Sequence, residues 1–151
     1  MLIGIDPLLT PELLKVLAEM GHGDEIAIVD ANFTATSLGA GKPLIALAGA
    51  GVQRVCQAVL SLLPLDASVA QPVAYMKVCD NPDGYRSALQ REVLDGLAAR
   101  GWLQPAQSQA MERFDFYKRV KAAFAIVRTG ELQPYANFLF KKGVIGEALR
   151  A

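Results

Sequence analysis

Apolar residues along this chain follow two alternating patterns, stripes at helical spacing and short uninterrupted runs. The first stripe follows Thr10 and Pro11, which are typical of a helix start, and Gly21 supplies its stop. Its apolar members are Leu13, Leu14, Leu17 and Met20. The first run, residues 26–29, is apolar throughout, as expected for a strand that is covered on both faces. The N-terminal part therefore predicts a helix followed by a buried strand.

The same alternation continues toward the C-terminus. Residues 31–43 are rich in Thr, Ser and Gly without a clear period, which predicts a long loop that is either functional or merely a connection. Strands that alternate with helices predict an α/β fold, here a three-layer α/β/α arrangement with a mostly parallel or mixed sheet. A chain of 151 residues needs only one domain, spanning residues 1–151. Further strands are predicted at 44–48, 73–78, 124–127 and 137–140, and further helices at 52–63, 85–100 and 114–123.

Charge and hydropathy restrict the class of partner. Fifteen Lys and Arg residues balance fifteen Asp and Glu residues, so the chain lacks the net positive field that attracts nucleic acid. Apolar residues make up 52% of the chain, which favours apolar surface covered in a homo-oligomer. The N-terminus has no basic and apolar leader, and no run approaches the roughly 18 apolar residues of a membrane span. We therefore expect a cytoplasmic protein without nucleic acid or membrane partners.

Metal and nucleotide motifs are not completed in this sequence. Cys56 and Cys79 form no CxxC pair, and with one histidine in the chain they do not make a four-ligand zinc site. We predict both cysteines as small buried hydrophobic residues. Gly49 and Gly51 begin a dinucleotide fingerprint, but Arg54 stands where its third glycine belongs.

The single histidine, His22, lies between two glycines directly after the first predicted helix. Histidine is the side chain that both gives and takes protons near neutral pH, and the carbonyl dipoles of a helix C-terminus favour its charged form. The flanking glycines leave the ring accessible. We predict a proton donor or acceptor at this turn; the alternative is a surface residue that caps the helix.

Asp30 follows the first predicted strand, where a parallel α/β sheet delivers side chains to a ligand crevice. Its carboxylate suits sugar hydroxyls, although an aspartate that caps a turn is the alternative. With a straight strand between them, the Cα atoms of His22 and Asp30 lie roughly 20 to 26 Å apart. If both contact one small ligand, either the chain doubles back or the site is shared between subunits.

Two further clusters offer groups that bind hydroxyls. Arg113 and Tyr117 lie in an aromatic segment that suits a small polar pocket, unless it only begins an amphipathic helix. Tyr135, Ala136 and Asn137 precede the last predicted strand and provide a phenol, backbone groups and an amide.

Taken together, four segments resemble the fucose mutarotase and ribose pyranase family along nearly the whole chain. They are residues 10–26, 30–33, 113–117 and 135–144. The fucose branch is more similar, because the Met-Gly-His-Gly-Asp turn and the Lys-Lys-Gly-Val segment match it. The resemblance implies an isomerase of monosaccharides that forms ring-like homo-oligomers, often decamers, with pockets between subunits and neither a metal nor an organic cofactor.

The family motifs also imply roles for individual residues. The histidine of the Gly-His turn transfers protons in this family, which places catalysis on His22. Asp30 and Arg113 match its sugar-binding positions. The Tyr-Ala-Asn motif of residues 135–137 completes the sugar-binding set, with Tyr117 beside it.

The chain departs from the fucose branch at two positions near Asp30. Asn32 and Thr34 stand where that branch usually has His and Pro, and the segment between Asp80 and Glu112 differs in sequence and length. These changes bear on which sugar is used. We expect a mutarotase that interconverts the anomers of L-fucose; the alternatives are pyranose/furanose exchange of D-ribose, a sugar-binding protein without catalysis, and a purely structural oligomer.

Overall fold

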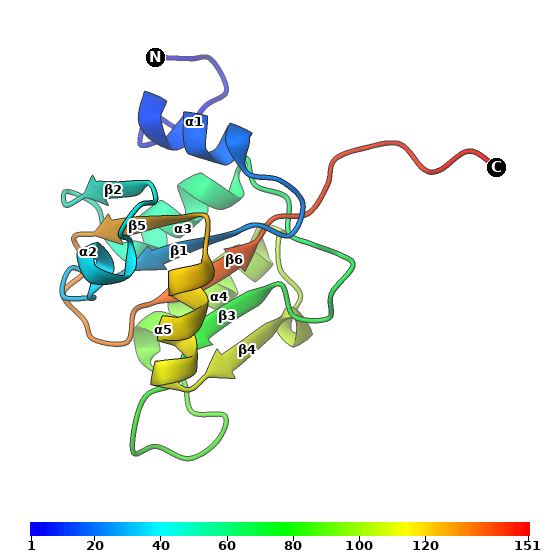
Figure 1. Ribbon diagram of the computed structural model, residues 1–151. Helices are drawn as coiled ribbons and strands as arrows, with labels where there is room; N and C mark the ends of the chain where they lie inside the picture. The colour runs from blue at the N-terminus through cyan, green and yellow to red at the C-terminus, as the bar shows by residue number, and fades with distance from the viewer.

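One mixed six-stranded sheet forms the centre of the molecule (Figure 1). The structure is a computed structural model that describes all of residues 1–151. Across the sheet the order is β2-β5-β1-β6-β3-β4, and β6 is the strand that runs opposite to the others. We call the edge where β6 begins and the other strands end the carboxyl edge, and the opposite edge the amino edge. The strands are β1 (Glu25–Val29), β2 (Leu44–Leu47), β3 (Val73–Met76), β4 (Ser108–Met111), β5 (Ala125–Thr129) and β6 (Phe138–Lys141).

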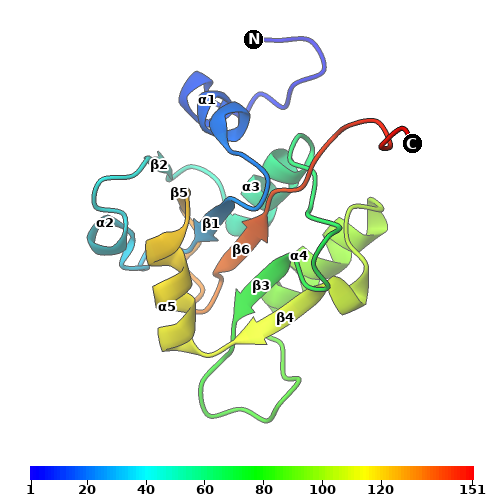
Figure 2. The same ribbon diagram turned by 45° about the vertical axis from the view of Figure 1, so that its right-hand side comes forward.

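Helices cover both faces of this sheet. Figures 1 and 2 show α2 and α5 on one face, and α3 and α4 on the other. The side chains of α1 join the same core cluster as those of α3 and α4. The helices are α1 (Pro11–Glu19), α2 (Ala35–Leu38), α3 (Val52–Leu60), α4 (Ala88–Ala99) and α5 (Arg113–Ala122), with a short 3₁₀ helix, η1 (Pro105–Gln107).

Strand β1 divides the core into two clusters because successive side chains of a strand point to opposite faces. Ile26 and Ile28 pack with α1, α3 and α4, whereas Ala27 and Val29 pack with α2 and α5. None of these four side chains is exposed to solvent. The apolar run that the sequence shows is thus a strand covered on both faces. The predicted three-layer α/β fold is confirmed.

The polar residues at the helix starts explain where the helices begin. The Thr10 hydroxyl accepts a hydrogen bond from the Leu13 amide at 3.2 Å, which caps α1 as predicted. Helix α4 begins at Ala88 rather than at residue 85, because Ser87 and Gln90 form a capping box there.

Three elements were not predicted from the sequence. Strand β4 has the sequence Ser-Gln-Ala-Met and lies at the edge of the sheet, so it pairs only with β3 and lacks an apolar run. Helices α2 and η1 have four and three residues, which is too short to show a helical period. Helix α2 lies inside the segment predicted as a long loop. None of the helices combines the length and the apolar character that crossing a membrane requires.

Candidate active site

A cavity of about 210 Å³ opens at the carboxyl edge of the sheet. It is smaller than the roughly 300 to 1,000 Å³ typical of drug-sized ligand sites. Five residues that the sequence predicts as sugar-binding line this cavity together: Asp30, Arg113, Tyr117, Tyr135 and Asn137. The other lining residues are Asn32, Phe33, Met76 and Pro134.

The sheet topology explains why these residues meet. Asp30 follows β1, and Asn137 precedes its antiparallel neighbour β6, in which Phe138 pairs with Ile28. Met76 ends β3, and Arg113 comes just after β4, both of which run parallel to β1. Segments distant in sequence therefore deliver their side chains to the same edge.

Asp30 and Asn137 form the buried floor of the site, with 5% and 2% of their surfaces exposed. The Asn137 amide nitrogen donates to Oδ2 of Asp30 at 2.9 Å, and the Asp30 backbone nitrogen donates to Oδ1 of Asn137 at 2.9 Å. The Asn32 backbone nitrogen donates to the other carboxylate oxygen at 2.9 Å. The two residues are thus held in one orientation, with oxygen lone pairs left for a ligand.

Burial has the largest effect on the pKa of the Asp30 carboxyl. Desolvation raises the pKa of its carboxyl, and the hydrogen bonds from Asn137 and from the Asn32 amide oppose that rise. A hydroxyl that donates to this carboxylate replaces part of the hydration that burial removes. The floor of the cavity is therefore suited to a polyhydroxyl ligand.

Helix α5 supplies a cationic and aromatic wall. Its N-terminus is capped by Glu112, whose carboxylate accepts from the Phe114 and Asp115 amides at 2.8 and 3.2 Å. Arg113 Nε donates to the Tyr117 hydroxyl at 3.0 Å, and its guanidinium lies 5.5 Å from the Tyr117 ring centroid. The predicted helix start is real, and it also turns Arg113 and Tyr117 toward the cavity.

Tyr135 reaches the cavity through an unusual backbone conformation. Its φ of 60° lies in the left-handed region, which residues with a side chain seldom adopt. A hydrogen bond with the Cys79 thiol raises the pKa of the Tyr135 phenol. Ala136 does not line the cavity; its methyl group packs in the core cluster beneath α3 and α4.

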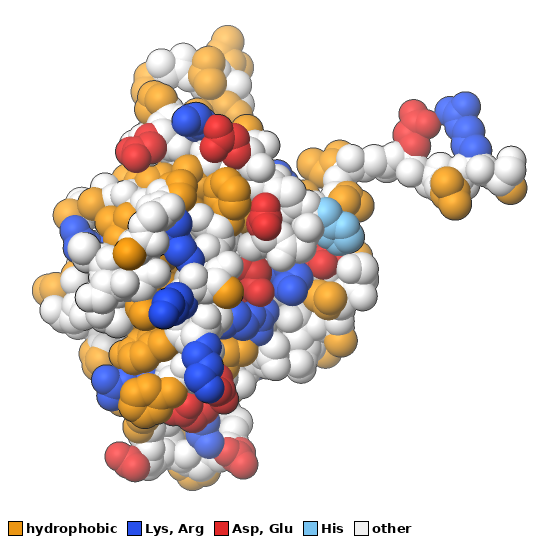
Figure 3. All heavy atoms as spheres, viewed as in Figure 1, with side chains coloured by type: hydrophobic (Ala, Val, Ile, Leu, Met, Phe, Trp, Pro, Cys, Tyr) orange, Lys and Arg blue, Asp and Glu red, His pale blue; other side chains and the backbone are white.

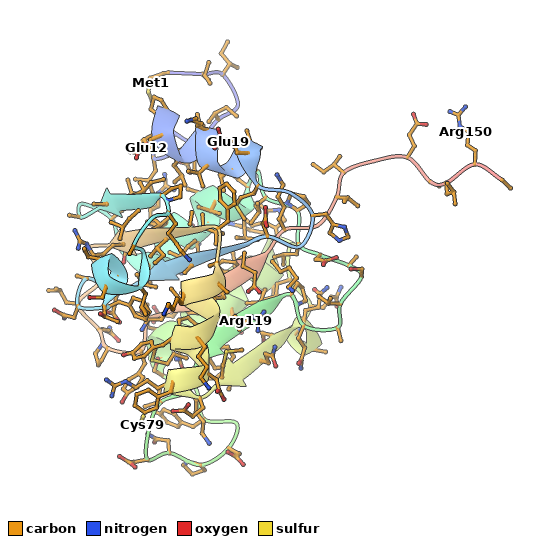
Figure 4. The ribbon with its side chains drawn as sticks, in the orientation of Figure 1. Met1, Glu12, Glu19, Cys79, Arg119 and Arg150 are labelled. Carbon is orange, nitrogen blue, oxygen red and sulfur yellow. The ribbon has the colours of Figure 1, made fainter.

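The prediction for the two cysteines is half right. Cys56 is fully buried, and burial raises the pKa of its thiol, as expected for an inert packing residue. The prediction that Cys79 is buried is wrong, because it lies exposed in the loop after β3. Figure 4 shows Cys79 at the end of the molecule away from Met1 and Glu12. The Asp-Asn-Pro-Asp-Gly sequence that follows it forms a turn region, which places Cys79 at the surface rather than in the core.

His22 lies at the opposite, amino edge of the sheet. Gly23 has a φ of 86°, which makes the turn possible, and its backbone nitrogen donates to the Lys142 carbonyl at 2.8 Å. The side chain of His22 is 50% exposed. Figure 3 shows this imidazole, the only one in the chain, on the surface at the base of the extended C-terminal segment. Within one chain, the structure does not bring His22 to the cavity that Asp30 lines.

Asp66 is a partner of His22 that sequence reasoning missed. Its Oδ1 lies 3.1 Å from His22 Nε2, and it also accepts from the Ser68 hydroxyl at 2.6 Å and the Ser68 amide at 2.9 Å. The bonds from Ser68 and from His22 lower the pKa of Asp66 to about 2. Asp66 stands 44 residues after His22 in an irregular segment, so no sequence pattern links the two residues. The one local signal is the Asp-Ala-Ser sequence, which is typical of a turn in which the aspartate side chain accepts a hydrogen bond from the backbone two residues later.

Larger hollows lie near α1 and the chain termini but lack this convergence of polar groups. One of about 550 Å³ is lined mostly by apolar side chains, among them Leu14, Leu17 and Leu62. No cluster of three or more His, Cys, Asp or Glu side chains is arranged to hold a metal ion. The polar groups that suit a small hydroxylated ligand gather at the carboxyl edge.

Comparison with known proteins decides the family. The model of the RbsD / FucU transport protein family matches residues 3–145. The chain belongs to this family. The resemblance that its motifs showed is thereby confirmed, and the matched range includes both the His22 turn and the cavity at the carboxyl edge.

Several curated relatives of this chain are named fucose mutarotases. The chain is 42% identical to the human fucose mutarotase over 145 residues, covering 94% of this chain and 93% of that protein. It is 42% identical over 144 residues to an L-fucose mutarotase of Haemophilus influenzae, covering 95% and 97% of the two chains. The crystal structure of the Streptococcus pneumoniae fucose mutarotase in complex with L-fucose superposes with a TM-score of 0.85 at 35% identity, covering 96% and 100%.

Proposed function

We propose that this protein is a mutarotase that interconverts the anomers of L-fucose. The observation that carries the proposal is the cavity at the carboxyl edge, where the buried Asp30 and Asn137 face Arg113 and Tyr135. Relatives that share 42% of the sequence over nearly their whole length are named for this activity. A solved relative with the same fold holds L-fucose.

The chemistry requires two proton transfers and no redox step. A base takes the proton of the anomeric hydroxyl, the bond between the anomeric carbon and the ring oxygen breaks, and an acid protonates the ring oxygen. Rotation of the aldehyde and the reverse steps then give the other anomer. General acid and base catalysis contributes roughly 10² to 10⁴-fold, which is ample for a reaction that already proceeds in water.

We assign the sugar hydroxyls to the cavity residues. The Asp30 carboxylate accepts hydrogen bonds from hydroxyls, whereas Arg113 donates to hydroxyl oxygens. The side chains of Tyr135, Tyr117 and Asn137 can each donate and accept hydrogen bonds. Ala136 links Tyr135 at the mouth of the site to Asn137 at its floor. Such binding keeps the open-chain form in place until it closes again.

We assign proton transfer to His22, with Asp66 holding its ring. Because His22 lies at the amino edge, the histidine that serves a given cavity comes from another copy of the chain. This arrangement requires a homo-oligomer, for which we propose the ring-like decamer implied by the family motifs, and we place the protein in the cytoplasm. The exposed apolar residues near both termini, among them Leu2 and Ile145, are available to such contacts.

The test measures anomer exchange by saturation transfer between the two anomeric proton signals. Wild-type protein is expected to accelerate exchange of L-fucose more than that of D-ribose. His22→Ala is expected to slow the exchange by at least about a hundredfold while the oligomer and sugar binding stay intact. Exchange that is faster for D-ribose would favour the pyranase alternative, and binding without acceleration would favour a sugar-binding protein. An unchanged rate in His22→Ala would remove His22 from the mechanism.

A further inference from the structure

Gln90 is a fully buried polar side chain on the first turn of α4 that the mechanism does not use. Its side-chain nitrogen donates to the Met76 carbonyl at 2.8 Å and to the Tyr135 carbonyl at 3.0 Å. Met76 and Tyr135 both line the sugar cavity. The side-chain amide of Gln90 thus donates its two hydrogens to backbone carbonyls of two residues that line the site.

The oxygen of the same side chain serves a different purpose. Gln90 Oε1 accepts a hydrogen bond from the Ser87 backbone nitrogen at 3.1 Å, and the Ser87 hydroxyl accepts one from the Gln90 backbone nitrogen at 3.1 Å. These two bonds form the capping box of α4. The oxygen therefore fixes the helix start, and the nitrogen reaches across to the end of β3 and to the segment before β6.

The two hydrogen bonds from the Gln90 side-chain nitrogen form what we call the tether, and Tyr135 depends on it more than its neighbours do. Its left-handed backbone, with φ at 60°, is disfavoured for any residue with a side chain and persists only where the surroundings hold it. The Tyr135 carbonyl is the atom that Gln90 holds. Its phenol faces the cavity, whereas the next residue, Ala136, points into the core.

We infer that Gln90 is a positioning residue of the sugar cavity, which fixes the left-handed backbone of Tyr135 and thereby the place of its phenol against the sugar. The inference rests on the proposed function, because it assigns Tyr135 to sugar binding. Gln90 itself contacts no sugar. It acts from the opposite face of the sheet edge, through two backbone carbonyls.

Two variants distinguish the role of the Gln90 side-chain nitrogen from that of its side-chain oxygen. Gln90→Glu keeps an oxygen for the Ser87 amide but, as a buried carboxyl, has at most one hydrogen to donate, so at least one of the two bonds to the Met76 and Tyr135 carbonyls is lost. Ser87→Ala removes a cap bond and leaves the tether in place. L-fucose dissociation constants, anomer-exchange rates and thermal midpoints are measured for both variants and for wild-type protein.

Gln90→Glu is expected to weaken L-fucose binding about tenfold, because a net hydrogen bond contributes roughly a factor of two to ten. Ser87→Ala is expected to lower the thermal midpoint while its dissociation constant stays at the wild-type value. In a Tyr135→Ala background, Gln90→Glu is expected to change the dissociation constant less than about twofold, because the side chain through which it acts is gone.

Equal dissociation constants for Gln90→Glu, Ser87→Ala and the wild type would overturn the inference and leave Gln90 as a helix cap. A wild-type protein that neither binds nor isomerises L-fucose would instead refute the proposed function. In that case, a crystal structure of Gln90→Glu still tests whether Gln90 holds the backbone of Tyr135. Departure of Tyr135 from the left-handed region supports the tether, and an unchanged backbone overturns it.

Discussion

His22 Nε2 lies 3.1 Å from Oδ1 of Asp66, a carboxylate with 5% of its side chain exposed. The bonds from Ser68 and His22 hold the pKa of Asp66 at about 2, so the carboxyl is ionised near neutral pH. An ionised carboxylate only accepts hydrogen bonds, which places a proton on Nε2. Under the proposed mechanism, Nδ1 of the neutral ring is then the nitrogen that is left to accept a proton from the sugar.

Asp66→Asn is expected to slow anomer exchange at saturating L-fucose by at least about tenfold, because the amide no longer fixes which ring nitrogen carries the proton. The dissociation constant for L-fucose is expected to stay near the wild-type value, since Asp66 lies outside the cavity. Saturation transfer gives the rate, and ¹⁵N chemical shifts of the ring report the tautomer. Ser68→Ala is the control, because it removes the 2.6 Å hydroxyl bond and keeps the carboxylate. A rate loss as large in Ser68→Ala as in Asp66→Asn would contradict this role.

Mixing two inactive variants is expected to restore activity. His22→Ala keeps the cavity, and Asp30→Ala keeps the histidine, so a site shared by two subunits regains both groups when the protomers are exchanged. Random mixing in equal amounts leaves about one quarter of the sites with both groups intact, since each site draws one group from each of two copies. Unfolding and refolding the mixture, followed by saturation transfer, measures the recovery. Separately refolded variants provide the baseline, and a mixture no more active than that baseline would place both groups on one chain.

The contribution of Asp66 to stability is expected to vanish in acid. Its pKa falls from 3.8 to about 2 on folding, so the carboxyl stabilises the fold above pH 3.8. That stabilisation is lost as the pH falls through the folded pKa of about 2. Urea unfolding of wild type and Asp66→Asn at a series of pH values measures the difference between their free energies of unfolding. The difference is expected to be level near neutral pH and to shrink toward pH 2, and a difference that grows on acidification would contradict the assignment.

Lys42→Met is expected to lower the free energy of unfolding by about 1 to 3 kcal/mol. The Lys42 ammonium donates to the carbonyls of Val120, Lys121 and Ala123 at 3.1, 2.6 and 2.6 Å, where α5 ends. A cation is favourable at this end of a helix dipole. Urea unfolding at neutral pH measures the loss.

Lys118→Met is the matched control for that experiment. Lys118 lies on α5 itself, but its side chain is 82% exposed and its ammonium lies 3.8 Å from the Asp115 carboxylate. Exposed pairs of this kind contribute about 0 to 1 kcal/mol. Equal losses in the two variants would show that Lys42 has no special part in ending α5.

The parts of the fold that could be predicted are those that local physics determines. The apolar run of β1 and the Thr10 cap of α1 depend on neighbouring residues, and both lie where the sequence indicates. Strand β4 could not be predicted, since its pairing with β3 rather than its own Ser-Gln-Ala-Met sequence makes it a strand. The same reasoning applies to Cys79, whose exposure follows from the course of a loop.

The candidate site divides in the same way. Asp30 and Asn137 were found from their places beside strands and from family motifs, and the structure adds that they are hydrogen bonded to each other. The contacts of Asp66 with His22 and of Gln90 with Tyr135 span 44 and 45 residues. No local pattern reports such contacts, because they exist only once the sheet has brought distant segments together.

Strand β1 lies between His22 and Asp30, so the proposed proton-transfer residue and the sugar cavity stand at opposite edges of the sheet. A substitution in the cavity lining, such as one at Asn32, changes the groups available to a ligand without touching the turn that carries the imidazole. Changes around Asp66 would, under the proposed mechanism, affect proton transfer without reshaping the cavity, which Asp66 does not line. The proposed mechanism therefore lets the choice of sugar change at one edge of the sheet while the pair of His22 and Asp66 at the other edge stays as it is.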